Sequence, residues 1–170
     1  MPTYISVLHF LITVSLGLLS GIALSLTYWT MPIVRLGPTT SSKIRQFNHI
    51  IYLGATYLQP SSRITPALML TELCVAYSAG DPRWKHYLAA ISVMVPVGPW
   101  EIFLIFPVND EIKEVGEKLK ADKKNDFGDG RDADVERLFD EWLKWHTARW
   151  VAPTVAMGIM VGSALELLPF

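Results

Sequence analysis

The stretch FDEWLKWHTARW, residues Phe139–Trp150, decides how the rest of the chain is interpreted. It leads directly into a long apolar run that ends near Leu168. Because a helix turns by about 100° per residue, four aromatic or basic side chains of this stretch share one face. They are Trp142, Trp145, His146 and Arg149. Such a face is typical either of an interfacial belt at the headgroup level of a membrane or of the polar rim of a ligand cavity.

Composition indicates a multispanning membrane protein with one domain. Of the 170 residues, 51% are hydrophobic and 18% are charged, whereas charged residues make up roughly 25% of a soluble domain. No charged residue precedes Arg35, and most of the others lie between Asp110 and Arg149. The net charge of −1 offers no surface for nucleic acid. The single cysteine, Cys74, excludes an internal disulfide.

Four apolar runs are long enough, or nearly so, to cross a bilayer. They predict an all-α fold, an integral membrane four-helix bundle that occupies residues 1–170. The polar residues 107–149 are predicted to form a cytosolic amphipathic loop between the third and fourth helices. Within it we expect a helix at Glu111–Lys120, a flexible link at KADKKNDFGDG, residues 120–130, and a helix from Ala133 that runs into the fourth span. The expected spans are residues 5–29, 61–79, 87–106 and 150–168.

Prolines mark the limits of these predicted spans. Pro32 and Pro60 lie in a connector, residues 30–60, which is expected to carry a short amphipathic helix on the membrane surface. Pro96 and Pro99 predict a kink in the third span, and Pro107 follows its end.

Two pairs of glycines are spaced for close helix approach, within the chain or between copies of a homo-oligomer. These pairs are Gly17 with Gly21 and Gly158 with Gly162.

Basic residues predict the orientation of the chain in the membrane. Most of them lie in residues 30–60 and 107–149, while the other side of the membrane holds only Arg83 and Lys85. The positive-inside rule therefore places the large loop in the cytosol and both termini in the lumen. The expected location is the endoplasmic reticulum.

Polar residues from three predicted helices converge at one depth in this topology. Glu72 and Glu101 are intramembrane acids, which normally face the interior of a bundle and mark functional sites. The convergence favours a site over an interfacial belt for the opening stretch. The converging residues are Arg63, Glu101, Asn109, His146 and Arg149, with Glu72 deeper in the bilayer.

The order of these motifs resembles a known family. Four apolar spans, Pro107 and Asn109 at the end of the third, and Trp142, His146 and Arg149 before the fourth are similar to anthrone-oxygenase-like proteins of fungal polyketide pathways. The resemblance covers most of the chain in layout, and its motif comprises about five residues. It implies a membrane enzyme that acts on a hydrophobic polyketide.

The chemistry implied by the resemblance is oxygenation of an anthrone to a quinone, with dioxygen as co-substrate and no cofactor. His146 suits the base that removes a methylene proton, because an imidazole titrates near neutrality. Arg149 and Asn109 suit the stabilisation of the anionic oxygen. Trp142 and Trp145 would stack on a flat substrate, and Arg63 would contribute to substrate binding at the same level.

An alternative is a polyketide epoxide hydrolase or cyclase. In this hypothesis Glu72 and Glu101 form an acid and base pair, one activating water or attacking carbon and the other donating a proton to the leaving oxygen.

A second alternative is a non-catalytic membrane scaffold whose polar groups only connect the helices. The four histidines are far apart in sequence and lack ligand spacing, so we expect no metal site.

Overall fold

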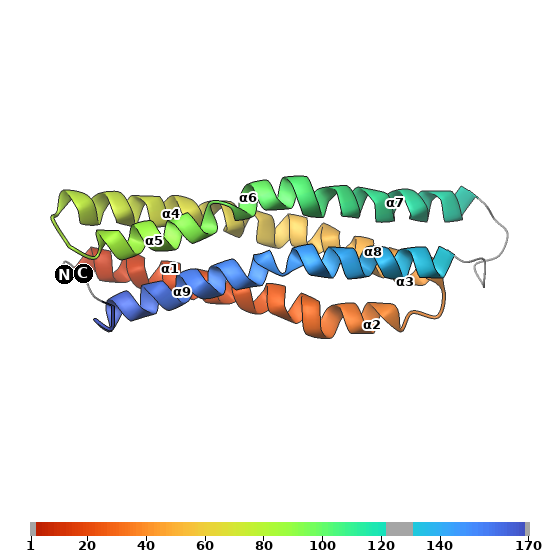
Figure 1. Cartoon of the computed structure of the whole chain (residues 1–170), viewed down its shortest axis with the longest axis horizontal. Coiled ribbons are helices and arrows are strands. Elements are labelled where there is room, and N and C mark those ends of the chain that lie inside the picture. The colour runs from red at the N-terminus through yellow and green to blue at the C-terminus, as the bar shows by residue number, and fades with distance from the viewer. Residues whose placement is uncertain (1–2, 122–130, 169–170) are drawn as a thin grey trace.

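Four long helical segments make up the part of the chain that the structure describes, residues 3–121 and 131–168, in a computed structural model (Figure 1). Segment one comprises α1 (Thr3–Ser25), the π-helix η1 (Leu26–Thr30) and α2 (Met31–Arg35). Segment two comprises α3 (Thr40–Leu53), the π-helix η2 (Gly54–Leu58) and α4 (Gln59–Ser78). Segment three comprises α5 (Trp84–Met94), α6 (Val97–Trp100), the π-helix η3 (Glu101–Ile105) and α7 (Phe106–Ala121). Segment four comprises α8 (Arg131–His146) and α9 (Ala148–Ala164).

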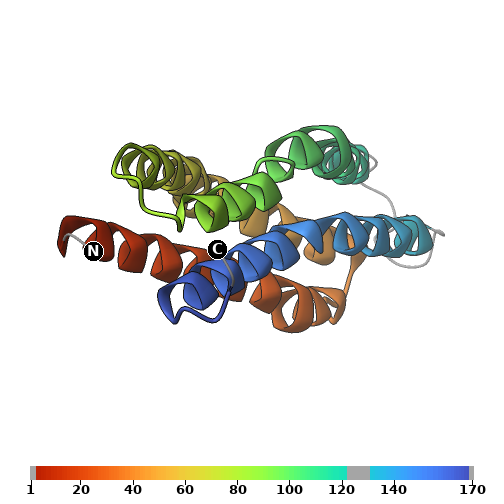
Figure 2. The same ribbon diagram turned by 60° about the vertical axis from the view of Figure 1, so that its left-hand side comes forward.

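The segments lie side by side along the long axis of the molecule (Figures 1 and 2). At the end that holds both termini, α1 packs against α4 and α9, and α5 packs against the same two helices. At the other end, α3 packs against α2, α7 and α8. No strand occurs in the described residues, so the predicted all-α class is confirmed.

Two hydrophobic cores lie one beyond the other along this axis. The core near the termini joins α1, α4, α5 and α9. The second core lies in the half that the sequence interprets as connector and polar loop, and it joins α2, α3, η3, α7 and α8. Its largest buried side chains are Phe47, Phe139 and Trp142. Half of the interior is therefore built from the stretches that look least apolar.

Residues 107–121 and 131–146 are helical in the structure, so the two helices predicted within the polar stretch are confirmed. α7 continues segment three to Ala121, and α8 starts at Arg131, so the predicted link lies outside the described residues from residue 122 on. Val108 and Ile112 of α7 and Val135 and Leu138 of α8 are buried. Their spacing of three or four residues places them on one helix face, which gives a polar stretch an apolar side.

The connector of residues 30–60 is helical except for the turn at residues 36–39. The helix predicted within it is α3, and the predicted start of the second span is corrected. Thr39 caps α3 by accepting a hydrogen bond from Ser42 N at 3.1 Å. α3 then passes through η2 into α4 without interruption. Because Ile44 and Phe47 are buried against α7 and α8, one face of α3 belongs to the second core.

Each π turn ends two residues before a proline, namely Pro32, Pro60 or Pro107. The backbone N–H of Met31 donates to Leu26 O, five residues back, and the other two turns have the same closing bond. A proline lacks an N–H, and its ring clashes with the carbonyl four residues earlier. The extra residue of a π turn displaces that carbonyl, so the helix continues through the proline.

Lys43 is the main ionic contact of the second core. Its ammonium donates to Asp132 Oδ1 at 2.9 Å and to Glu136 Oε1 at 2.8 Å, although the lysine itself is buried. The hydrogen bond with Lys43 is the main reason that the pKa of Asp132 is lowered. The bond with Glu136 is the main reason that the pKa of Lys43 is raised.

Lys43→Met is expected to lower the free energy of unfolding by about 1–2 kcal/mol, because it removes the hydrogen bonds to Asp132 and Glu136. The loss stays this small because both acids are partly exposed and can be hydrated by solvent. A carboxyl with a lowered folded pKa stabilises the fold above its unfolded pKa, near 3.9, and this contribution is lost as the pH falls through the folded value. Thermal unfolding from pH 7 to pH 3 should therefore show a steeper acid loss in the wild type than in the variant. Parallel curves would contradict the assignment.

Within the described residues, two segments are long and apolar enough to span a membrane, Ile5–Arg35 and Trp84–Ala121. In their most apolar windows only 28% and 17% of the residues are buried inside the protein, so these helices expose apolar surface. Gly17 lies against α9, where an added Cβ would be 3.1 Å from Met157 Sδ. This close approach occurs within the chain, and association between copies remains a prediction.

Candidate active site

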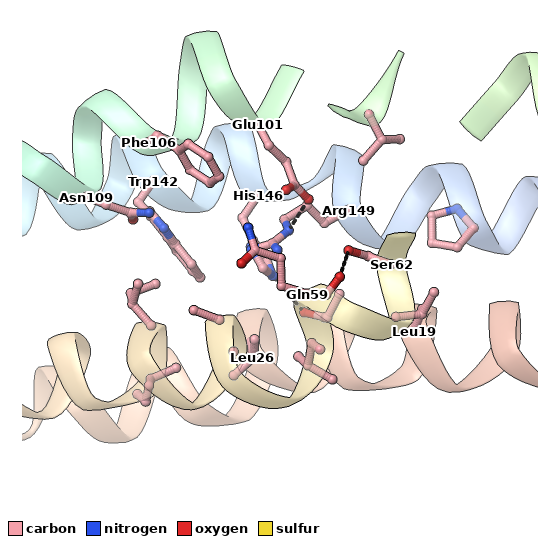
Figure 3. A pocket seen from close by; sticks show the side chains of 18 of the residues that line it. Leu19, Leu26, Gln59, Ser62, Glu101, Phe106, Asn109, Trp142, His146 and Arg149 are labelled. Carbon is pink, nitrogen blue, oxygen red and sulfur yellow. Dashed lines mark hydrogen bonds and ion pairs between the residues drawn. The ribbon is translucent and has the colours of Figure 1, made fainter. Parts of the chain in front are cut away.

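A cavity of about 100 Å³ lies where the π turns and the junction of α8 and α9 meet (Figure 3). One water needs roughly 10–15 Å³ on the same scale, so the cavity has room for ligand atoms. All four segments line it, with Leu26 from η1, Gly54 from η2, Glu101 from η3 and His146 from α8 among the contributors. π turns are frequent at functional sites because they displace a backbone carbonyl and re-aim neighbouring side chains.

The cavity lining is divided between apolar and polar sides. Segment one and the η2 region supply mainly aliphatic groups, among them Leu19 and Leu26, and α4 adds Gln59 and Ser62. Segments three and four supply the ionisable and aromatic groups, as Figure 3 shows. The polar residues of these two segments are Glu101, Asn109, Trp142, His146 and Arg149.

His146 has a defined tautomer in this cavity. Its ring is almost fully buried, and Nε2 lies 3.2 Å from the carbonyl oxygen of Ala23 in α1. Because a carbonyl oxygen only accepts, Nε2 must carry the proton. Nδ1 is also buried and has no partner in the described chain. Burial, and then the positive charge of Arg149, lower the pKa of His146, so the ring is neutral with a free lone pair on Nδ1.

The ring of Trp142 packs against the imidazole of His146. The two rings stack with centroids 4.2 Å apart and planes 17° from parallel. The indole Nε1 is a buried donor with no partner in the described residues, and Asn109 Oδ1 is a buried atom in the same condition. Native proteins leave few buried polar atoms unpaired, and each such atom requires an explanation. Here three of them belong to side chains of one cavity, which is the pattern of a ligand site.

Arg149 is fixed by an ion pair with Glu101. Arg149 Nε lies 2.8 Å from Glu101 Oε1, and both side chains are mostly shielded from solvent. The pair joins α9 to η3 across the cavity (Figure 3). Within the described chain the two terminal guanidinium nitrogens have no hydrogen-bond partner, so they can donate to a ligand oxygen. The pair therefore positions a cationic donor beside the imidazole.

A sequence model of the anthrone oxygenase family matches residues 47–159 of this chain. The chain belongs to the anthrone oxygenase family. No curated protein and no solved structure matched in the corresponding searches. The matched region of this anthrone oxygenase family member runs from α3 into α9 and contains every polar cavity residue of segments three and four. It begins after Ala23, whose carbonyl fixes His146.

Two residues predicted for the substrate site lie outside the cavity of this family member. Trp145 is half-buried, its carbonyl oxygen accepts from Trp100 Nε1 at 2.9 Å, and the Lys144 ammonium lies 4.5 Å from its ring. Arg63 is exposed and is not part of the lining. The opening helix face is thus split, with Trp142, His146 and Arg149 at the cavity and Trp145 on its outer side.

Glu72 lies in a different polar cluster from Glu101. It is fully buried, and its Oε1 contacts His9 Nδ1 at 2.8 Å. His9 Nε2 lies 3.0 Å from Met160 O, so Nε2 is the donor and one proton is shared between His9 Nδ1 and Glu72. Glu72 does not line the cavity, while Glu101 does. The two acids therefore do not form the predicted acid and base pair.

Sequence reasoning missed several cavity residues. Gln59 and Ser62 flank Pro60, where the sequence predicts the boundary between the connector and the second span. Ala23 takes part through its backbone carbonyl, which no side-chain pattern can indicate. The sequence signal that marks the π turns around the cavity is the set of three prolines that follow them, Pro32, Pro60 and Pro107. Among the described residues, no three His, Cys, Asp or Glu side chains come together as a metal site.

Proposed function

We propose that this chain is a membrane-embedded anthrone oxygenase that converts an anthrone-like aromatic polyketide to its quinone. Family membership supports an oxygenase of polyketide metabolism. The observation that carries the mechanism is His146, whose Nδ1 is buried and unpartnered at the cavity while Ala23 holds its other nitrogen. The imidazole is neutral and oriented, so its Nδ1 lone pair can accept a proton. Its lowered pKa makes it a weaker base than a free histidine, so catalysis has to come mainly from positioning and from stabilisation of the anion.

The reaction consumes one dioxygen and releases one water. His146 Nδ1 removes a proton from the methylene between the aromatic rings, leaving a carbanion that is delocalised onto the ketone oxygen. The carbanion supplies electrons to dioxygen, and a carbon–oxygen bond forms. The peroxide takes the proton from His146 to become a hydroperoxide. Loss of the second methylene proton and cleavage of the O–O bond give the second ketone and water.

The anionic oxygen needs donors that are already in place before the proton moves. Arg149, held by Glu101, supplies a cationic guanidinium next to the imidazole. The amide of Asn109 and the unpartnered indole N–H of Trp142 provide two further polar groups of the same cavity. In this proposal Trp142 binds through its N–H, because its ring face already stacks on His146.

A rate measurement tests the activity. The chain is purified in detergent, 1,8-dihydroxyanthrone is added under air, and quinone absorbance is followed. We expect formation well above the spontaneous rate. A rate equal to that of a protein-free control, from a chain that keeps its helical circular dichroism, would reject the proposed function and favour the scaffold hypothesis.

The membrane setting is part of the proposal. Large apolar side chains are exposed along segments one and three, including Phe10, Leu18 and Trp29 of segment one and Phe103 of segment three. A soluble protein rarely exposes so large an apolar surface, whereas a lipid-facing surface requires it. The basic residues of the half away from the termini then favour the cytosol, with both termini in the lumen of the endoplasmic reticulum.

Glu72→Gln is expected to leave quinone formation within about twofold of the wild-type rate, because Glu72 lies outside the cavity. The glutamine amide can still donate to His9 Nδ1, so the helix contact is kept. Steady-state rates with 1,8-dihydroxyanthrone measure the effect. A rate more than tenfold lower, with unchanged thermal stability, would show that Glu72 takes part in catalysis.

A further inference from the structure

The cavity continues into a groove between α3 and α7. This groove has a volume of about 500 Å³ and is lined by residues from Ser41 to Ala55 on one side and from Asn109 to Lys120 on the other. Three residues line both hollows, Ile51 and Ala55 from segment two and Asn109 from α7. The two hollows are therefore neighbours and meet at these side chains.

The junction is at the surface of the protein. Ala55 is exposed although it lines the cavity, and Phe106 is also exposed at the cavity edge. Below the groove α3 and α7 are in close contact, since a Cβ added to Gly116 would lie 2.7 Å from Ile44 Cγ2. The helices thus touch along the groove floor and leave an opening beside the η2 turn. Of the described residues of segment two, Ile51 and Ala55 line both hollows, and the side chain of Ala55 is only a methyl group.

We propose that the groove between α3 and α7 is the access path through which a flat, amphiphilic aromatic substrate reaches the cavity from the polar half of the protein. The path rests on the proposed function, and it adds the route and the side of approach. The alternative, direct passage from the hydrocarbon region of the bilayer between other helices, is an outcome of the test below.

The chemistry of the groove fits such a substrate. Near the junction, Ile51 and Tyr52 offer apolar and aromatic contact area. Farther out, Arg45 and Lys113 stand on opposite helices and can attract phenolate or carboxylate groups. At the inner end the unpartnered Oδ1 of Asn109 can accept a hydrogen bond from a phenol. An aromatic polyketide with several hydroxyl groups carries both kinds of surface.

The test blocks the groove without touching the cavity. In a Cys74→Ser background, Asn48→Cys places a thiol in the groove, outside the cavity. His49→Cys is the matched control, because the next residue of the same helix is exposed and lines neither hollow. Both variants are labelled with a polyethylene glycol maleimide. Binding of 1,8-dihydroxyanthraquinone is followed by stopped-flow quenching of tryptophan fluorescence.

A blocked path slows entry and exit equally. We expect the label at Asn48→Cys to lower the association and dissociation rates together by about tenfold or more, with Kd unchanged, and the label at His49→Cys to leave both rates unchanged. Equal association rates in the two labelled variants would overturn the path alone and leave the proposed function standing. Absence of quinone binding by the unlabelled chain would overturn both.

Discussion

Replacing His146 with glutamine is expected to lower the rate of quinone formation by about 100-fold or more, the usual contribution of a positioned general base. The glutamine Nε2 can take the place of the imidazole Nε2 and donate to Ala23 O, so the contact between α8 and α1 is kept. What the variant loses is the free lone pair at the position of Nδ1. Initial rates of quinone absorbance, corrected for the spontaneous rate, measure the effect.

His146→Asn is the complementary control. Its amide can occupy the position of Nδ1 but cannot reach Ala23, so it removes the basic lone pair and the contact with α1 together, whereas His146→Gln removes the lone pair alone. Both variants should keep the helical circular dichroism of the wild type, and both should bind 1,8-dihydroxyanthraquinone. An undiminished rate in His146→Gln would remove the imidazole from the chemistry and with it the proposed mechanism.

Arg149→Met is expected to reduce kcat/KM by about 100-fold, because the variant removes the cationic donor for the developing oxyanion. It also leaves the shielded carboxylate of Glu101 without its partner, so the unfolding temperature should fall. A double variant, Arg149→Met with Glu101→Gln, removes the unpaired charge. It is expected to recover thermal stability but not activity, which separates the two roles of the arginine.

Glu101→Gln alone serves as the matched control for Arg149. The amide oxygen of the glutamine can take the place of Glu101 Oε1 beside Arg149 Nε, so the guanidinium keeps its position. We expect a loss in kcat/KM of less than about tenfold. If Glu101→Gln were as inactive as Arg149→Met, the carboxylate itself would take part in the reaction, and the assignment of Glu101 as a positioning residue would be wrong.

The fold class could be predicted from the sequence, but the extent of the helices could not. Apolar runs and the absence of alternating patterns predict helices, and the structure confirms the class. The predicted spans end before Pro32 and Pro107 and begin after Pro60. In the structure each of these prolines follows a π turn that accommodates the missing N–H, so the segments continue. Local propensity identifies a proline as a helix breaker. It does not indicate that the preceding turn can become a π turn that lets the helix continue.

The candidate site was partly predictable because helix periodicity places Trp142, His146 and Arg149 on one face of segment four. The structure brings Glu101 and Asn109 to them. Periodicity could not identify the partner of Glu72, because His9 lies on a helix whose rotation depends on packing. Nor could it give the tautomer of His146, which depends on a backbone carbonyl in α1.

The origin of the oxygen in the product tests the central claim most directly. The purified chain is given 1,8-dihydroxyanthrone under ¹⁸O₂ in ordinary water, and the quinone is analysed by mass spectrometry as it forms. The account predicts one labelled oxygen per quinone, at a rate that exceeds the protein-free control and depends on His146. Quinone that carries its new oxygen from water, or labelled quinone that forms no faster than without protein, would contradict it.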